Sequence, residues 1–461
     1  MDTKSSMLFN VENTRQLLAS KSIHVCVVGI GRIGLPTALS FANYGLETTG
    51  VDVNDKLIEM INTGRYPLKD EPGFDIIFDN VRKNKKLKAT KDIQQTLSQC
   101  ELVILSLPTP MDGKNIPDYS ALLTVANSLN NFIKSGTVIV VESTVEPGFI
   151  ENELTPLVQG DGSRIKCGID FTIAACPETA NPGEILADFK KLPRVIGAID
   201  EITTEIVSEI YKHVFNVEIL KMPNCRTANA VKLTTNVFRD VNIAFINELA
   251  ILFEKLDIDI MTVLQAASKK YNFQVHYPGA GVGGPCLPVN SYQLLNSAGW
   301  SKGSGLLKLV DVARKINEYM PSHVIELLSE ALKEKGLFGK EITVAILGIS
   351  YKPNVKDIQL SPAENIIKKL DSMNAKIKIY DPYFKSTTVF SHKTEENLID
   401  TITNTDACIL VTSHNEFLEI DPTFLVSKMK SPIVIDTRSS FDPHVAKKAG
   451  ITYRGIGRGG V

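Results

Sequence analysis

The sequence predicts an α/β protein in which two parallel-sheet domains are joined by a long central helix and a helical domain. Short apolar runs alternate with helical stretches at both ends of the chain, a pattern typical of parallel sheets covered by helices on both faces. Between them, residues 226–256 have a continuous helical pattern without Gly or Pro. We therefore expect Rossmann-like, doubly wound domains at 1–215 and 336–461, separated by a helical domain at 216–335.

Five apolar runs in the first part of the chain have the length and composition of buried strands. These runs are residues 24–30 (HVCVVGI), 46–53, 101–108, 137–144 and 171–178. The first run leads directly into a glycine-rich turn and then into an Ala- and Leu-rich helical stretch. We predict that these strands form one parallel sheet.

The central segment is predicted to be mainly helical. A helix over 226–256 would be about 45 Å long, which is longer than one domain needs, so we expect it to join domains and to offer a surface for dimerisation. A loop rich in Gly and Pro at 277–288 (YPGAGVGGPCLP) interrupts the helical sequence. Four further apolar runs predict the second sheet, at 342–349, 375–382, 406–413 and 432–438.

Composition limits the classes of function. The 461 residues are 43% hydrophobic and 22% charged, with a mean hydropathy near zero, which excludes disordered, collagen-like and disulfide-rich chains. A net charge of -2 supplies no concentrated positive field, so we expect binding neither to nucleic acid nor to a membrane. No apolar run approaches the roughly 20 residues that span a bilayer. The seven histidines show no ligand spacing, so no metal site is expected.

Cysteine usage and the N-terminus indicate the compartment. The seven cysteines form no CxxC pair, and their odd number leaves at least one thiol free. This usage is typical of a reducing compartment, and the N-terminus lacks the basic region and apolar segment of a secretory signal. We expect a soluble, cytoplasmic protein.

Gly29, Gly31 and Gly34 spell GxGxxG between a predicted strand and a predicted helix. Glycines here permit a tight turn and let a pyrophosphate approach the helix N-terminus. Asp52 ends the next strand, where a carboxylate can accept hydrogen bonds from a ribose hydroxyl. A tight turn with a capping acid is the simpler interpretation, but strand, turn, helix, strand and acid in this order favour dinucleotide binding. Because an acid repels a 2′-phosphate, we predict NAD rather than NADP.

Two further loops follow predicted strands, at 106–118 (SLPTPMDGKNIPD) and 142–149 (ESTVEPGF). Open α/β sheets bind their ligands at the carboxyl ends of the strands. Spacing alone is equally compatible with ordinary turns at both places.

Cys286 lies in GVGGPCLP, between Gly and Pro residues. Glycines let the backbone approach a ligand closely, and the prolines restrict the position of the thiol. Most cysteines are inert packing residues, and the other six fit that interpretation, because Cys26, Cys176 and Cys408 lie in apolar strands. Cys286 is therefore the candidate nucleophile.

Lys232 and Asn236 are four residues apart, so they share one face of the long helix. Without other observations, a solvated Lys on an exposed helix is the preferred interpretation. Asn247 and Glu248, further along the helix, are equally compatible with caps for neighbouring elements.

Together these segments resemble the UDP-glucose/UDP-N-acetylmannosamine dehydrogenase family over residues 24–458. The motifs that carry the resemblance are VGIGRIGLP, VDVN, LPTP with PD, ESTVEPG, CPETANPGE, VKLTTNVFRDVNIAFINELA, GVGGPCLP, LGISYKPNVKD with SPA, and YDPY. The resemblance implies oxidation of C6 of a UDP-sugar from alcohol to carboxylate, with two NAD in succession and no metal. It also implies a homodimer formed through the long helix.

The resemblance assigns roles to five residues. Cys286 would capture the C6 aldehyde as a thiohemiacetal, whose oxidation gives a thioester for water to hydrolyse. Lys232 would stabilise the developing oxyanion or help accept the alcohol proton, and Asn236 would orient the same oxygen. Glu178 matches the family carboxylate near the hydrolytic water, and Thr144 matches the Thr that holds this water.

The resemblance also implies the binding residues. Those for the cofactor are Gly29, Gly31, Arg32, Ile33, Gly34, Asp52, Pro108, Thr109, Ser143 and Thr144. Those for the UDP-sugar are Glu178, Lys232, Asn236, Gly283, Gly284, Lys352 and Arg438.

Several positions depart from the family pattern. Asn290 stands where the family usually has a catalytic Asp, and an amide cannot act as a general base. Either Glu178 or Lys232 then handles proton transfer, or hydrolysis is slow, or activity is absent. The family also commonly has acids at the positions of Asn229 and Thr235, and an Arg at the position of Gln359. A missing guanidinium would weaken a phosphate or interface contact.

Sugar choice depends on the segment PETANPG, in which Pro182 occupies the place of the Glu found in UDP-glucose enzymes. The segment and the VGG before Cys286 are closer to the branch for N-acetylated sugars, although Thr179 replaces that branch's Arg. We predict UDP-N-acetyl-D-mannosamine as substrate, for polysaccharide or glycan synthesis. UDP-N-acetylglucosamine and UDP-glucose are the alternatives, because these residues give neither the C2 stereochemistry nor the N-acetylation of the sugar.

Two other classes of function remain open on the sequence. One is a nucleotide-sugar- or NAD-binding protein that lacks hydrolysis because of Asn290. The other is a two-electron alcohol dehydrogenase that stops at the aldehyde and is indifferent to thiol alkylation.

Overall fold

The computed structural model describes residues 10–69, 71–297 and 305–459 and divides into two compact units. One unit contains the chain up to Thr235 and, among the described residues, the short segment 292–297. The other contains Asn236–Ser291 and the chain from Gly305 onward. The division falls within two helices, α10 (Cys225–Lys255) and α12 (Leu287–Ser297). The predicted domain boundaries at residues 215 and 335 stay predictions.

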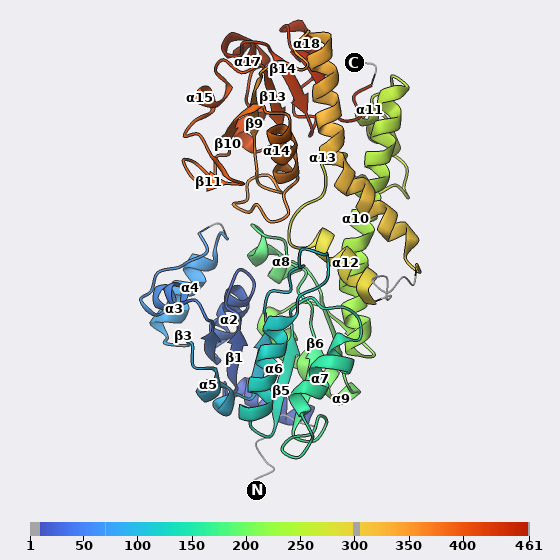
Figure 1. The fold of residues 1–461 in the computed structure, drawn as a ribbon. Helices are drawn as coiled ribbons and strands as arrows, with labels where there is room; N and C mark the ends of the chain where they lie inside the picture. Colours follow the sequence, from blue (N-terminus) through green and yellow to red (C-terminus); the bar gives the residue numbers. More distant parts are fainter. Residues whose placement is uncertain (1–9, 70, 298–304, 460–461) are drawn as a thin grey trace. The chain divides into compact units, whose positions relative to one another are not determined.

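The first unit is built on an eight-stranded sheet, drawn in blue to green in Figure 1. Its strands are β1 (His24–Val28), β2 (Glu47–Val51), β3 (Leu87–Thr90), β4 (Leu102–Leu105), β5 (Thr137–Val141), β6 (Phe171–Ala175), β7 (Arg194–Ala198) and β8 (Ile219–Met222). The order is β3-β2-β1-β4-β5-β6-β7-β8. The first six strands are parallel, and their order is that of dinucleotide-binding folds. The five predicted strands β1, β2, β4, β5 and β6 are all parallel, as expected, and β7, which was not predicted, is antiparallel to β6.

Successive strand residues point to opposite sides of this sheet, so its apolar strands present hydrophobic side chains on both faces. Helices cover each of these faces. Val25 and Val27 of β1 belong to one apolar core, whereas Cys26 and Val28 belong to the other. The covering elements are α1 (Val11–Ala19), α2 (Gly34–Asn43), α3 (Asp55–Asn62), α4 (Phe74–Lys83), α5 (Ile93–Gln99), α6 (Ser120–Phe132), the π-helical turn η1 (Ile150–Leu154), α7 (Thr155–Gln159), α8 (Ile185–Lys191) and α9 (Glu201–Phe215).

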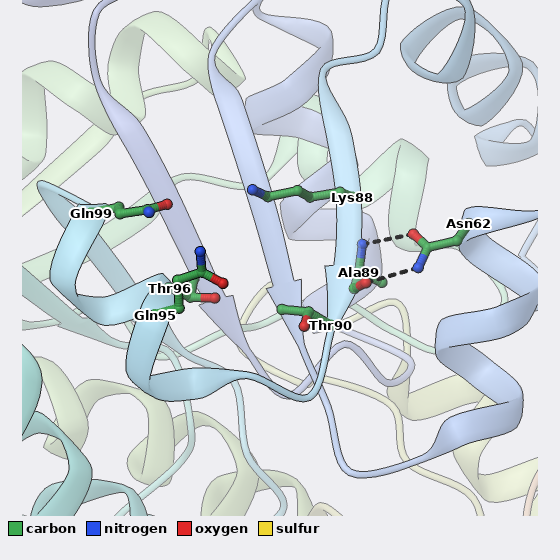
Figure 2. A pocket seen from close by; sticks show the side chains of 7 residues that line it. All are labelled: Asn62, Lys88, Ala89, Thr90, Gln95, Thr96 and Gln99. Atoms are coloured by element: carbon green, nitrogen blue, oxygen red, sulfur yellow. Dashed lines mark hydrogen bonds between the residues drawn. The ribbon is translucent and has the colours of Figure 1, made fainter.

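The edge strand β3 is protected by a side chain. The Asn62 amide donates to the Ala89 carbonyl (2.8 Å) and its oxygen accepts from the Ala89 N–H (2.9 Å), as Figure 2 shows. This bidentate pairing satisfies backbone groups that would otherwise be open to another strand. The pocket beside it, of about 390 Å³, contains none of the predicted site residues.

The second unit carries the remaining helices and a five-stranded parallel sheet, drawn in orange to red in Figure 1. The order is β10-β9-β13-β14-β15. Its strands are β9 (Thr343–Leu347), β10 (Lys376–Tyr380), β13 (Ala407–Leu410), β14 (Ile433–Asp436) and β15 (Thr452–Gly455), with the hairpin β11 (Thr388–Val389) and β12 (His392–Lys393) beside them. Its helices, besides the two that cross the division, are α11 (Ile260–Ala267), α13 (Lys308–Glu334), α14 (Pro362–Ser372), α15 (Leu398–Ile402), α16 (Asn415–Leu418), α17 (Pro422–Lys428) and α18 (Pro443–Lys448).

This second sheet also has an apolar core on each face. Residues of α10, α11, α13 and α14 pack on one face, and residues of α15 to α18 contribute to the core on the other. In the register, Leu347 of β9 lies beside Tyr380 of β10 and Leu410 of β13, which in turn lies beside Asp436 of β14. The loops after these strands therefore start at one edge of the sheet.

The predicted α/β architecture is confirmed, including all nine predicted strands and the long helix. The sequence analysis missed β3, β7, β8 and β15, and also the two-residue strands β11 and β12. β3 and β8 are partly exposed edge strands, so they lack a continuous apolar run. β7 begins with Arg194, whose charge conceals a strand that is buried throughout.

Candidate active site

The glycine-rich turn between β1 and α2 has two glycines that the backbone requires and one that it does not. Gly29 has φ +84°, and a Cβ there would lie 2.5 Å from the Ser106 carbonyl oxygen. A Cβ at Gly34 would lie 1.8 Å from the Gly29 oxygen. Apart from its own neighbours in the chain, a Cβ at Gly31 would meet no atom of the described residues within 4 Å. The open space beside Gly31 is therefore where a pyrophosphate can approach the helix N-terminus.

Asp52 lies directly after β2, beside this turn. One carboxylate oxygen accepts from the Ile30 N–H (3.0 Å), and the other accepts from the Asn54 N–H (2.9 Å). Each oxygen has a second lone pair. The fixed carboxylate thus keeps acceptor capacity, and its contact with ribose hydroxyls stays a prediction.

Arg32 and Ile33 occupy the same turn but differ in their contacts. The Arg32 guanidinium forms an ion pair with Glu71 (2.8 Å), which is buried and also accepts from the Gly183 N–H (2.9 Å). The Ile33 side chain is partly buried and packs against the apolar core. Glu71 escaped the sequence analysis because its partners are distant in sequence.

The loops after β4 and β5 are joined by hydrogen bonds. They start at the same edge of the sheet, because β4 and β5 are neighbouring parallel strands. Thr109 Oγ1 donates to the Thr144 carbonyl (2.8 Å). Ser143 Oγ accepts from the Leu107 N–H (2.8 Å), next to Pro108. The structure thus brings together four of the predicted cofactor contacts.

Glu178 follows β6 and is almost completely buried. Its Oε1 accepts from the N–H groups of Thr179 and Ala180, both at 2.7 Å. Its Oε2 forms a buried ion pair with Arg194 of β7. The carboxylate is therefore held in one orientation by three donors.

In the second unit, Cys286 directly precedes α12. Its carbonyl accepts from the Asn290 N–H (2.8 Å), in the first turn of this helix. Cys286 therefore immediately precedes the first turn of α12, to which its backbone is hydrogen-bonded. Among the seven free cysteines only Cys167 is also partly exposed, and burial raises its pKa to about 12. Five are buried: Cys26, Cys100, Cys176, Cys225 and Cys408.

Gly283 and Gly284 allow the Cys286 loop to pack against the loops after β9. A Cβ at Gly283 would lie 2.5 Å from the Leu360 carbonyl oxygen. Gly284 has φ +89°, and a Cβ there would lie 2.6 Å from the Tyr351 ring. These two glycines therefore have a packing role, whatever they bind.

Lys232 and Asn236 lie one turn apart on α10 and are both buried, at 7% and 8% exposed. The interpretation of Lys232 as a solvated surface residue is therefore wrong. Asn236 Nδ2 donates to Asn290 Oδ1 (2.5 Å), so Asn290 serves here as a hydrogen-bond acceptor. The family's Asp would present an acceptor at the same place.

Arg438 and Lys352 follow strands of the second sheet at its carboxyl edge. The Arg438 guanidinium donates to the Val411 carbonyl (3.2 Å). A Cβ at Gly279 would lie 2.3 Å from Arg438 Nη1, so the glycine makes room for this side chain. Burial lowers the pKa of Arg438, although Asp436 opposes this shift. Lys352 lies in the loop after β9.

Comparisons with known proteins cover nearly the whole chain. Residues 23–215 match the NAD binding domain of the UDP-glucose/GDP-mannose dehydrogenase family, 226–319 its central domain and 345–443 its UDP binding domain. A UDP-N-acetyl-D-mannosamine dehydrogenase of Pyrococcus horikoshii is 33% identical over 440 residues, which cover 95% of this chain and 100% of the relative. The chain belongs to the UDP-glucose/GDP-mannose dehydrogenase family.

Solved structures of such dehydrogenases share the fold. A UDP-D-ManNAc dehydrogenase from Pyrococcus horikoshii has a TM-score of 0.88 at 32% identity and covers 95% of this chain and 100% of its own. An NDP-N-acetyl-D-galactosaminuronic acid dehydrogenase from Methanosarcina mazei Go1 has a TM-score of 0.84 at 29% identity, covering 97% and 98%.

Membership confirms the resemblance read from the sequence. The chain is an NAD-dependent nucleotide-sugar dehydrogenase, whose cofactor domain contains the glycine turn described above. The open space at Gly31 and the acceptor at Asp52 fit NAD. In the described part of the chain, no helix is long and apolar enough to cross a membrane.

The dehydrogenase also contains a buried acid that the sequence analysis did not single out. Glu142 directly follows β5 and accepts from Thr37 Oγ1 (3.0 Å) and Tyr211 Oη (2.8 Å). Burial raises the pKa of Glu142 to about 7; the Arg194 charge opposes this shift and the Glu178 charge adds to it. The motif ESTV contained this acid, but no local signal distinguishes a buried Glu from a surface one.

Proposed function

We propose that the chain oxidises C6 of UDP-N-acetyl-D-mannosamine to the uronate, a four-electron reaction that uses Cys286 as nucleophile. The observation that carries the substrate is the full-length similarity to dehydrogenases named for this sugar, from archaea and from Campylobacter jejuni. The segment PETANPG agrees with an N-acetylated sugar.

The first oxidation removes a hydride from C6 and a proton from its oxygen, and the proton passes to solvent. NAD, when bound in the first unit, would supply the hydride acceptor for each of the two oxidations. Lys232 and Asn236 are the candidates that stabilise the charge developing on the oxygen. Their low exposure supports this role, because electrostatic stabilisation is stronger away from water.

The second oxidation proceeds on the enzyme. Cys286 sulfur adds to the aldehyde carbon and the aldehyde oxygen takes up a proton, which forms a thiohemiacetal. Loss of a second hydride and of the hydroxyl proton gives a thioester. Water then adds to this carbon, the C–S bond breaks, and the carboxylate and the thiol are released. Glu178 and Thr144 are the candidates that position this water.

The test is NADH formed per sugar consumed, with UDP-N-acetylmannosamine, UDP-N-acetylglucosamine and UDP-glucose assayed separately. We expect two NADH with UDP-N-acetylmannosamine. Two NADH with only another sugar would reassign the substrate. One NADH would indicate an enzyme that stops at the aldehyde, and binding without NADH would indicate a nucleotide-sugar-binding protein.

A matched pair of variants tests the nucleophile. Cys286→Ser should abolish formation of the uronate, whereas Cys167→Ser replaces the other partly exposed thiol and should leave it unchanged. Uronate formation by Cys286→Ser at the wild-type rate would contradict the covalent mechanism.

We also propose that the enzyme is a homodimer formed through α10. Phe238, Phe245 and Leu252 are spaced seven residues apart and are 47%, 50% and 48% exposed. They form an apolar stripe on one side of the helix, which is typical of a surface that another helix covers. Phe245→Lys should yield a monomer in light scattering, and a monomeric wild-type protein would contradict the proposal.

A cytoplasmic location is proposed on the chemistry of the thiols. All seven cysteines are free, as expected in a reducing compartment. Fractionation of cells should recover the enzyme with cytoplasmic markers; recovery elsewhere would contradict this.

A further inference from the structure

Five buried polar side chains in the second unit form a connected hydrogen-bond network around the segment that carries Cys286. They come from three helices and are each at most 3% exposed. They are Asp240 and Asn247 of α10, Ser291 of α12, and Arg314 and Asn317 of α13. A buried polar network is costly unless its members are paired, so its presence in a helical core needs an explanation.

One end of the network holds the chain before Cys286. Asn247 Oδ1 accepts from the Gly279 N–H (2.9 Å), and Asn247 Nδ2 donates to Asn317 Oδ1 (2.9 Å). The next glycine, Gly281, packs closely here as well, because a Cβ on it would lie 3.0 Å from the Asn317 carbonyl oxygen. Asn247 and Asn317 thus contact the loop that leads to the thiol.

The other end holds the chain after Cys286. Ser291 Oγ donates to Asp240 Oδ2 (2.7 Å). Asp240 Oδ1 accepts from Arg314 Nη1 and from Asn317 Nδ2, both at 2.8 Å. Asn317 is therefore shared by both ends, and it joins the two attachments into one unit.

The segment between these attachments needs such support. It contains Gly279, Gly281, Gly283 and Gly284, which supply no side chain to pack and have the greatest backbone freedom. Thiol addition to an aldehyde requires the sulfur close to the carbon, and a misplacement of about 1 Å can cost about a hundredfold in rate.

We propose that the network from Asn247 through Asn317 and Asp240 to Ser291 positions the Cys286 thiol for its addition to the substrate aldehyde. Its members are positioning residues, since they act through the Cys286 segment and none of them is assigned to the substrate or the cofactor. The proposal rests on the function proposed above, in which Cys286 is the nucleophile. It adds that the rate of the covalent step is set by side chains of α10 and α13.

The test compares Asn247→Ala and Ser291→Ala, which each release one end, with Leu425→Ala. Leu425 is fully buried on α17, in the core on the opposite face of the second sheet, so its truncation lowers stability without removing a bond of the network. All variants are assayed at a temperature where circular dichroism shows them folded. The readouts are kcat, the KM for sugar and for NAD, and the rate at which iodoacetamide alkylates Cys286, followed by peptide mass spectrometry.

We expect Asn247→Ala to lower kcat about 10- to 100-fold, with each KM changed less than about threefold. Ser291→Ala should act in the same direction, and it decides the matter if Asn247→Ala does not fold. The alkylation rate should change at least about threefold in both variants and stay within about twofold of wild type in Leu425→Ala.

The proposal is overturned if both network variants have the same kcat and the same alkylation rate as Leu425→Ala. The function proposed above fails separately, through an unaltered rate of uronate formation in Cys286→Ser. If wild type forms no NADH, the alkylation rates still decide whether the network positions the thiol.

Discussion

Gly31→Ala is predicted to separate NAD binding from folding. Among the residues that the structure describes, no atom other than those of Gly31 and its two chain neighbours lies within 4 Å of the new methyl group, and the Gly31 backbone is outside the left-handed region. Stability should therefore be unchanged or rise by up to about 1 kcal/mol, because Ala restricts the unfolded chain. The methyl group instead occupies the space for the pyrophosphate. Loss of one hydrogen bond to a charged group, about 1.5–3 kcal/mol, corresponds to a rise in Kd of roughly 10- to 150-fold.

The matched variant is Gly34→Ala, three residues away. Its methyl group would lie 1.8 Å from the Gly29 carbonyl oxygen, so the turn itself must move. We expect a loss of about 3 kcal/mol in the free energy of unfolding. Urea unfolding measures stability, and titration calorimetry measures the Kd for NAD. Wild-type affinity in Gly31→Ala would refute the assignment of this turn to the pyrophosphate. If Gly31→Ala is destabilised as much as Gly34→Ala, the conclusion that the space beside Gly31 can hold a methyl group is refuted.

Three further predictions concern buried polar groups and are read out by urea unfolding. The pKa of Glu142 rises from 4.5 to about 7 on folding, so its protonated form is favoured and its contribution is lost as pH rises across this range. Relative to Glu142→Gln, the wild type should lose about 3 kcal/mol in its free energy of unfolding as the pH rises from 4.5 to above 7. Parallel pH profiles of the two proteins would contradict this. Arg194→Met should destabilise by about 3–5 kcal/mol, because it leaves the Glu178 carboxylate buried without its charge partner; adding Glu178→Gln should restore part of the loss, and an additive loss would contradict the ion-pair explanation. Asn229→Leu should stabilise by about 1–3 kcal/mol, because both amide atoms are buried without a hydrogen-bond partner among the described residues; a destabilised variant would show that the amide is satisfied.

Much of the site was predictable because its signals are local. Gly34 is required by a contact within the turn and Gly29 by its positive φ, and Asp52 follows the next strand in the parallel order. Cys286 stood out among seven cysteines because its neighbours are Gly and Pro. Each of these signals depends on a few consecutive residues, so one sequence is sufficient to reveal it.

The buried charges were not predictable in this way. Arg194 and Glu178 belong to segments on either side of α8, and only their shared burial distinguishes them from surface charges. Asn247 was equally compatible with a helix cap, until the fold placed Gly279 and Asn317 at its two amide atoms. The partners of such residues are distant along the chain and are brought together only by the fold.

The sequence by itself determined the α/β class, the NAD-binding turn and the nucleophile candidate, because hydrophobic periodicity and glycine geometry act over short distances. The tertiary structure alone decided which polar side chains are buried, and with which partners. The free energy of a buried charge or amide depends on groups brought together from distant parts of the chain, so the burial of Lys232 and the raised pKa of Glu142 exist only in the folded molecule.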